Sequence, residues 1–335
     1  MTADLQGTLA DLRDGILAAD RAAIGRAITL LESTRPDHRV DARALLSGLG
    51  GYDGGAHRIG ITGVPGVGKS TFIEALGSHL TAAGHRVAVL AVDPSSSVTG
   101  GSILGDKTRM QGLANDPNAF VRPSPSSGTL GGVTRSTNET IVLLEAAGYD
   151  VVLVETVGVG QSETAVASMV DFFLLLILPG AGDELQGIKK GVLELADMIA
   201  VNKDDGETSG DARAAARDYS AAMRLTHVAT PSWTPPVVTC SARTGEGLAE
   251  IWQQVEAHRE AFVATGEWDQ NRRAQRLAWM WSMLEDRLLA AVRENPAVLA
   301  ILPELERSVL DAEVTPSVAA DRLLDAIGGP SPATS

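Results

Sequence analysis

The chain has 335 residues, of which 44% are hydrophobic, so it can form one large domain or two small ones with a packed core. Its formal net charge of −14 disfavours non-specific nucleic-acid binding, which requires a basic face, and we expect no nucleic-acid partner. A single cysteine excludes an internal disulfide and fits a reducing compartment.

The sequence contains no pattern for secretion or membrane insertion. Residues Met1 to Asp4 lack the basic and apolar regions of a secretory signal. The longest apolar run, Phe172 to Pro179, is about half as long as a helix that spans a bilayer. We therefore expect a soluble, cytoplasmic protein without a membrane partner.

Residues 1–55 are predicted to form a helical segment in front of the main domain. Apolar residues recur there at helical spacing in two stripes, and residues 43–49 indicate a third helix. The stripes are Leu5, Leu9, Leu12 and Ile16, then Ile24, Ala27, Ile28 and Leu31. A glycine-rich loop at 50–55 follows. We find no catalytic pattern in this segment.

Residues 63–70 fit the pattern G-x-x-x-x-G-K-[ST] of a phosphate-binding loop. The pattern and the next residue comprise Gly63, Val64, Pro65, Gly66, Val67, Gly68, Lys69, Ser70 and Thr71. The glycines let backbone N–H groups approach phosphate oxygens, Lys69 places a charge on the β- and γ-phosphates, and the Ser70 hydroxyl can ligate Mg²⁺. The alternative is a glycine-rich turn that matches by chance. A predicted strand at 58–62 and a helical pattern after the loop favour nucleotide binding.

From residue 58 to about residue 243, short apolar runs alternate with helical patterns. Most runs are apolar throughout, which indicates strands of a parallel sheet with helices on both faces. The runs are 58–62, 87–92, 151–156, 172–178, 198–201 and 236–240. Ligands of such α/β folds bind beyond the carboxyl ends of the strands, so the polar residues there form the candidate site.

Two aspartates follow the run 87–92. Asp93 ends that run and either binds Mg²⁺, directly or through water, or caps the following turn. Asp106 is a second candidate Mg²⁺ contact, and the alternative is an ordinary N-cap for a helix over 106–114. Residues 122–134 are predicted to form a loop.

Glu155 ends the strand that starts at residue 150, and Gly158 follows three residues later. This arrangement is that of the Walker B or D-x-x-G motif with Glu in place of Asp, so it favours a role near the metal over a merely polar strand end. The glycine-punctuated segment 179–191 is either a switch loop or a loop that enters a helix.

The run 198–201 leads into the N-K-x-D spacing of guanine-reading loops. We predict that Asp205 accepts hydrogen bonds from guanine N1 and N2, a donor pair that adenine lacks. Asn202 and Lys203 are predicted to pin the loop. Together these residues select a guanine nucleotide.

The last run, 236–240, ends in a second candidate base contact. Ser241, Ala242 and Arg243 resemble the S-A-[KL] loop that backs the base in GTPases. We interpret Cys240 as a small buried apolar residue at the strand end, with a reactive thiol as the alternative.

Residues after the last predicted strand are expected to be helical. An amphipathic helix is predicted over 246–263, a long helix over 268–294, and two short helices over 296–327. The apolar face of the long helix comprises Leu277, Trp281, Leu284, Leu288 and Val292, widened by Trp279 and Met280. This face either packs on the parent domain or binds a partner, and we favour a dimer arm because Trp and Met are enriched at interfaces.

These patterns give a domain plan. The helical segment 1–55 precedes a nucleotide domain at 56–265 and a C-terminal helical dimerisation region at 266–327. The tail, 328–335, is expected to be disordered.

Together the motifs resemble those of the MeaB/ArgK/MMAA G proteins, the GTPase chaperones of adenosylcobalamin-dependent methylmalonyl-CoA mutase. The matching stretches are 63–71, 91–96, 155–163 and 202–205, and residues 105–110 are similar as well. The E-T-V-G-V-G-Q and D-P-S-S sequences within them are not general features of GTPases. The resemblance covers about residues 20–300.

The resemblance implies a P-loop NTPase of the SIMIBI class, a homodimer held by C-terminal helices, and a mutase partner. It also implies that GTP binding and hydrolysis gate the loading and protection of the cobalamin cofactor. Lys69 and Ser70 would hold phosphate and Mg²⁺, and residues 179–191 would be the switch that senses the mutase. The implied shell of Mg²⁺ and water consists of Asp93, Asp106 and Glu155.

The expected reaction is Mg²⁺-dependent hydrolysis of GTP to GDP and phosphate. Gln161 lies three residues past Gly158, not next to it as in Ras-like proteins, so no water-positioning group is assigned. Asp204 replaces the small residue of the common N-K-A-D and is expected to point outward without altering guanine preference. The first alternative function is a P-loop kinase for a protein or small molecule. The second is a nucleotide-switched protein with negligible hydrolysis, and a nickel-insertion GTPase is disfavoured because its His/Cys cluster is absent.

Overall fold

The computed structural model describes residues 2–50, 55–92, 110–122, 130–156, 162–180, 190–226 and 232–328. The chain divides into two compact units, Met1–Gln275 and Arg276–Ser335. The first unit contains the predicted parallel sheet and the nucleotide motifs, and the second consists of helices.

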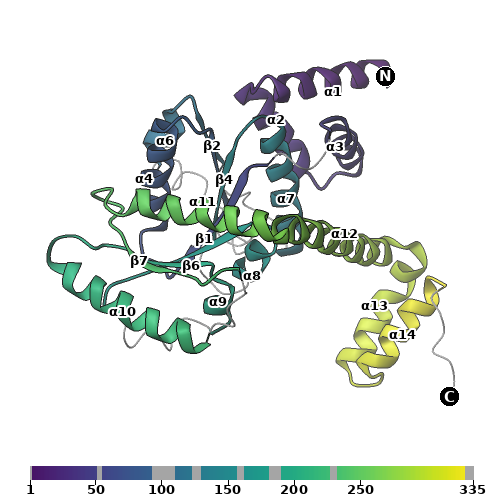
Figure 1. Cartoon of the computed structure of the whole chain (residues 1–335). Helices are drawn as coiled ribbons and strands as arrows, with labels where there is room; N and C mark the ends of the chain where they lie inside the picture. The colour runs from purple at the N-terminus through teal and green to yellow at the C-terminus, as the bar shows by residue number, and fades with distance from the viewer. Residues whose placement is uncertain are drawn as a thin grey trace. The chain divides into compact units, whose positions relative to one another are not determined.

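Seven parallel strands form the sheet, in the order β3-β2-β4-β1-β5-β6-β7 (Figure 1). They are β1 His57–Gly63, β2 Val87–Val92, β3 Ala119–Arg122, β4 Val151–Thr156, β5 Phe172–Ile177, β6 Met198–Val201 and β7 Val237–Thr239. All the predicted strands are confirmed to within a residue or two. The predictions missed β3, a short strand at the edge of the sheet. Its last two residues are only partly buried, and its four residues are too few to form a long apolar run.

Helices cover both faces of the sheet. Helix α4 (Lys69–Ala82) and helix α11 (Leu248–Thr265) share one core cluster with alternate residues of β1, β2, β4 and β5. A second cluster joins Leu175 and Ile177 of β5 to Tyr219 of α10 (Ser209–Thr226). Four further helices in the described part of the nucleotide domain are α6 Gln111–Asn115, α7 Leu130–Ala146, α8 Ser162–Ala167 and α9 Lys190–Leu195. No helix among the residues described here is long and apolar enough to cross a membrane.

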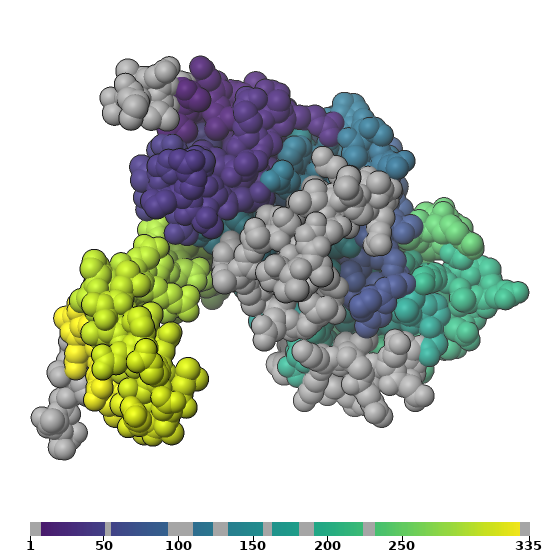
Figure 2. Space-filling view, turned by 180° about the vertical axis from the view of Figure 1, so that it is seen from behind, coloured from purple at the N-terminus to yellow at the C-terminus, as the bar shows by residue number. Residues whose placement is uncertain are grey.

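The predicted N-terminal helices are confirmed as α1 (Thr2–Leu17), α2 (Arg21–Glu32) and α3 (Pro36–Gly48). They form the purple body in Figure 2. Helix α3 begins earlier than predicted because Pro36 fits the first helical turn and Asp37 there favours the positive end of the helix dipole. The Arg21 guanidinium donates to the carbonyl oxygens of Ala114 and Asp116 at 3.1 Å, which ties α2 to the end of α6.

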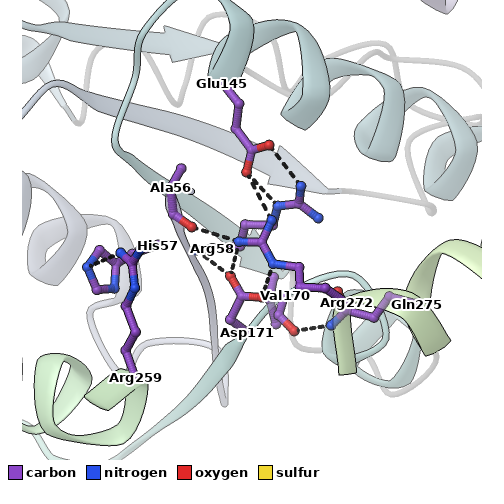
Figure 3. A network of polar contacts seen from close by, with 9 residues as sticks. All are labelled: Ala56, His57, Arg58, Glu145, Val170, Asp171, Arg259, Arg272 and Gln275. Atoms are coloured by element: carbon purple, nitrogen blue, oxygen red, sulfur yellow. Dashed lines mark hydrogen bonds and ion pairs between the residues drawn. The ribbon is translucent and has the colours of Figure 1, made fainter. Parts of the chain in front are cut away.

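A buried network of charges lies at the amino ends of β1 and β5 (Figure 3). Arg58 binds Glu145 of α7 through two hydrogen bonds of 2.7 and 2.9 Å. Arg272 of α12 (Glu267–Glu294) binds both carboxylate oxygens of Asp171 at 2.6 Å and the Ala56 carbonyl at 2.7 Å. Two cations and two carboxylates thus compensate one another in the core and attach the first turns of α12 to the sheet.

The second unit comprises the rest of α12 with α13 (Pro296–Leu310) and α14 (Pro316–Ala326), as predicted. The predicted apolar face of α12 is largely exposed, including Leu277 (55%), Trp281 (53%) and Leu288 (57%). Trp268, by contrast, lies in the first unit, where the guanidinium groups of Arg259 and Arg272 are 5.1 and 5.2 Å from its ring centre.

Candidate nucleotide-binding site

The phosphate-binding loop connects the end of β1 to the start of α4, as its pattern predicts. All three of its glycines have positive φ angles, 152° at Gly63, 83° at Gly66 and 93° at Gly68, and Gly63 and Gly68 also have close neighbours. A Cβ atom at Gly63 would lie 2.5 Å from the Leu176 carbonyl oxygen, and one at Gly68 would lie 3.1 Å from Asn202 Nδ2. Sterics therefore require glycine at both positions, which leaves the backbone N–H groups at the start of α4 open to an anion.

Lys69 and Ser70 occupy the first turn of α4. Lys69 is buried, and its Nζ donates to the carbonyl oxygens of Gly63 at 2.7 Å and Val64 at 3.3 Å. Burial lowers the pKa of Lys69, although the carboxylates of Glu155 and Glu163 oppose this shift. The ammonium group is therefore held beside the loop by weak carbonyl acceptors, which a phosphate group can replace.

Glu155, near the end of β4, accepts a hydrogen bond of 3.1 Å from the Ser70 hydroxyl. The structure thus brings together two oxygen donors of the predicted metal group, and oxygen is the ligand type that Mg²⁺ selects. Asp93, Asp106, Gln161 and most of the predicted switch, 181–189, lie outside the described residues. Within the described part of the chain, no cluster of His, Cys, Asp and Glu forms a further metal site.

The guanine-reading motif follows β6 and contacts the phosphate-binding loop directly. Asn202 Nδ2 donates to the Val67 carbonyl at 2.9 Å, and Lys203 Nζ donates to the Gly66 carbonyl at 3.1 Å. The Asn202 side-chain oxygen also accepts the Ala242 N–H at 3.0 Å. Asn202 and Lys203 therefore attach the loop after β6 to the phosphate-binding loop, and Asn202 also connects it to the loop after β7.

Asp205 lies between its own loop and the loop after β7. The Ser241 hydroxyl donates to one of its carboxylate oxygens, and the Arg243 guanidinium pairs with the other. Ser241 is fully buried, and its hydroxyl oxygen accepts the Thr244 N–H at 3.2 Å. The loop 241–243, predicted to back the base, thus lies beside Asp205, the residue predicted to read it.

The prediction that Asp204 points outward was wrong. Its side chain is only 9% exposed and accepts a hydrogen bond from Ser209 at the start of α10. Burial alone would raise the pKa of Asp204, but hydrogen bonds from Ser209 and Thr239 and the Arg213 charge lower it overall. Asp204 thus stabilises the turn between the motif and α10.

Cys240 is buried, as predicted for a small apolar residue. Burial and the nearby Asp204 raise the pKa of its thiol to about 12, which disfavours the alternative of a reactive thiolate. The sequence reasoning assigned no role to Glu163, although it is buried and its charge acts on Lys69. The signal was its place in the first turn of the helix that follows the Glu155 strand.

The chain is similar to known proteins over most of its length. The family model "Methylmalonyl Co-A mutase-associated GTPase MeaB" matches residues 24–297. A probable GTPase of Mycobacterium tuberculosis is 61% identical over 318 residues, which are 95% of each chain. The mouse protein "Methylmalonic aciduria type A homolog, mitochondrial" is 46% identical over 325 residues, covering 94% of this chain and 78% of the relative.

A solved structure is similar over nearly its whole length. The crystal structure of "LAO/AO transport system kinase" has a TM-score of 0.74 and 37% identity, covering 96% of this chain and 98% of that one. The P-loop fold with a parallel sheet and helical flanks is thereby confirmed. The chain therefore belongs to the family of methylmalonyl-CoA mutase-associated GTPases described as MeaB.

Proposed function

We propose that the protein binds GTP with Mg²⁺, hydrolyses it to GDP and phosphate, and by this cycle gates cofactor loading and protection of an adenosylcobalamin-dependent methylmalonyl-CoA mutase. The observation that carries the nucleotide part is the pair of contacts from Asn202, to Val67 in the phosphate-binding loop and to Ala242 in the base loop. These contacts hold a triphosphate cradle and a guanine-reading carboxylate on one rigid frame.

The roles proposed for Lys69, Ser70 and Glu155 follow from their positions, and those of Asp93 and Asp106 rest on the sequence motifs. Backbone N–H groups at the start of α4 and the Lys69 ammonium would bind the β- and γ-phosphates. Ser70 and Glu155, together with Asp93 and Asp106, would hold the metal ion. When bound, Mg²⁺ supplies neutralisation of charge on the phosphate oxygens. Catalysis then rests on positioning and electrostatic stabilisation rather than on a covalent enzyme intermediate.

The mutase part of the proposal rests on the family description and on the printed name of the mouse relative. The exposed face of α12, with Leu277, Trp281 and Leu288, supports a homodimer because such a face is costly to leave in water. A pull-down with GTP or GDP tests the mutase partner. A mutase subunit should co-purify in a nucleotide-dependent manner, and capture that is absent with both nucleotides would refute this part.

Hydrolysis is tested by Lys69→Ala, with GTP cleavage measured in the presence and absence of purified mutase. Because Lys69 places the only charge within the loop 63–70, its loss should reduce the rate by about 100-fold or more, the scale of a lost electrostatic contact to a transition state. Arg273→Ala, at an exposed position on α12, is the control and should keep the wild-type rate. Equal rates for Lys69→Ala and the control would reject the site.

The alternative of a P-loop kinase is kept because the similar solved structure is named a transport system kinase. Radiolabelled γ-phosphate distinguishes the two functions. Release of all label as inorganic phosphate in the presence of candidate acceptors supports the GTPase, whereas label on a protein or small molecule supports the kinase.

A further inference from the structure

Asp205 has two hydrogen-bonding partners of different kinds. Ser241 is fully buried and is itself held by the Thr244 N–H, so its bond fixes the orientation of the carboxylate. Arg243 contacts Asp205 through its guanidinium, and its side chain is 73% exposed to solvent. One partner is therefore part of the permanent structure, and the other can leave without disturbing the core.

The exposed partner occupies a carboxylate oxygen of Asp205 that a bound base would also use. The Asp205 side chain is only 16% exposed, so little of the carboxylate is open to solution. The Arg243 guanidinium pairs with one of its two oxygens, and Arg243 Nη2 lies 3.8 Å from the point where a Cβ on Gly206 would stand. Guanine would have to present N1–H and N2–H to the same carboxylate that Arg243 already contacts.

We propose that Arg243 competes with guanine for Asp205, so that it closes the base site in the nucleotide-free protein and is displaced when the nucleotide binds. This inference rests on the proposed function, because it assumes that Asp205 reads guanine. Arg243 belongs to the loop that is predicted to back the base, and the proposal gives this residue a role that opposes nucleotide binding. Arg243 thereby reduces the affinity for guanine nucleotides instead of adding to it.

The size of the effect follows from exposure. An exposed ion pair shifts an equilibrium by only about two- to five-fold, because solvent screens it and ordering two side chains costs entropy. The apparent dissociation constant of a ligand is inversely proportional to the fraction of the protein that is in the binding-competent state. Removing the competitor should therefore tighten binding by about two- to five-fold, mainly through a faster association rate.

The chain offers a matched control. Arg213 pairs with the neighbouring carboxylate, Asp204, at 3.7 Å and is 65% exposed, but it does not contact Asp205 in the described structure. Arg213→Ala and Arg243→Ala each remove one positive charge near the site. Lost long-range attraction for an anionic nucleotide weakens binding in both variants, whereas release of Asp205 tightens binding only in Arg243→Ala.

The experiment is isothermal titration calorimetry of the full chain with GDP and Mg²⁺. Arg243→Ala should bind GDP about two- to five-fold more tightly than wild type, and Arg213→Ala should bind equally or more weakly. In an Asp205→Asn background, titrated with xanthosine diphosphate, the gain from Arg243→Ala should disappear. Unchanged or weaker binding by Arg243→Ala, equal tightening by Arg213→Ala, or a gain that persists without the carboxylate would overturn the competition.

These outcomes are separate from failure of the proposed function. If the folded wild-type protein bound no GDP at all, guanine-nucleotide binding itself would be refuted, and the competition with it. If wild type binds GDP and only the variants depart from expectation, the nucleotide site stands and Arg243 has no opposing role.

Discussion

Replacement of Arg272 by methionine should destabilise the first unit strongly. The guanidinium makes bonds of 2.6 Å to both oxygens of Asp171 and of 2.7 Å to the Ala56 carbonyl, and it lies 3.4 Å from Glu145. Methionine keeps the apolar part of the side chain but removes every one of these contacts. Asp171 would keep the Arg58 N–H at 3.1 Å, and the buried cluster would carry an uncompensated negative charge.

The magnitude follows from that charge. Breaking a buried ion pair by removing one partner costs about 3–5 kcal/mol, a large part of the roughly 5–15 kcal/mol that stabilises a domain. With an m-value of about 3 kcal/mol/M, the urea midpoint should fall by about 1–1.7 M. Burial raises the pKa of Asp171, and the charge of Arg272 opposes this shift. Without Arg272 the pKa of Asp171 in the folded state rises further, so the variant loses stability as pH increases and Asp171 becomes charged. The difference in unfolding free energy between the variant and wild type should therefore shrink as pH falls.

Urea unfolding followed by circular dichroism measures this deficit. Arg273→Met is the control, because it makes the same substitution one residue further along α12 at an exposed position and should cost less than about 0.5 kcal/mol. The double variant Arg272→Met/Asp171→Asn removes both charges and should recover part of the loss. A deficit below about 1 kcal/mol, or one equal to that of the control, would show that the network does not stabilise the fold as reasoned.

Two further predictions concern the base site and acid stability. Asp205→Asn should weaken GTP relative to XTP by roughly 10- to 100-fold, since a hydrogen bond to a charged group is lost, and competition binding with unchanged selectivity would contradict base reading by Asp205. Burial lowers the pKa of His258 to about 4 from its usual 6.5, so its contribution is fully present above pH 6.5 and is lost as pH falls to 4. The loss amounts to about 3 kcal/mol, and His258→Phe should flatten this limb of a stability–pH curve, whereas an unchanged slope would exclude His258 as its cause. Asp197, whose Oδ1 is 3.7 Å from His258 Nε2, acts in the opposite direction, because burial raises its pKa to about 7 and its contribution falls as pH rises.

The strands and the site motifs were predictable because both are encoded locally. Most of the strands contain a continuous apolar run, and Lys69, Glu155 and Asp205 each lie at or shortly after the end of a strand. Parallel strands place such ends at one edge of the sheet, so the motifs converge without any knowledge of strand order. The order itself, with β4 between β2 and β1, was not predicted, because no local pattern specifies it.

Long-range partners were the part that sequence could not supply. Arg272 meets groups that lie 101 and 216 residues away, and its place on an amphipathic helix gave no sign of a buried charge. Asp204 was expected outside because a charged residue is usually solvated, but the start of α10 offered it the Ser209 hydroxyl. In both cases a specific hydrogen-bonding partner from another element, acceptors for Arg272 and a donor for Asp204, outweighed the general cost of burial.

Acidic residues at the amino ends and at the carboxyl ends of the strands accept hydrogen bonds from different kinds of donor. Asp150, Asp171 and Asp197 stand directly before β4, β5 and β6, and each accepts a backbone N–H associated with a neighbouring strand, at 2.7, 3.1 and 2.8 Å. At the opposite edge Glu155 and Asp205 bind hydroxyl and guanidinium groups, which can exchange for a ligand. A backbone donor cannot be withdrawn without breaking the sheet, whereas a side chain can rotate away. Backbone donors therefore help to fix Asp150, Asp171 and Asp197 in the fold, whereas the side-chain donors that Glu155 and Asp205 have can rotate away from them.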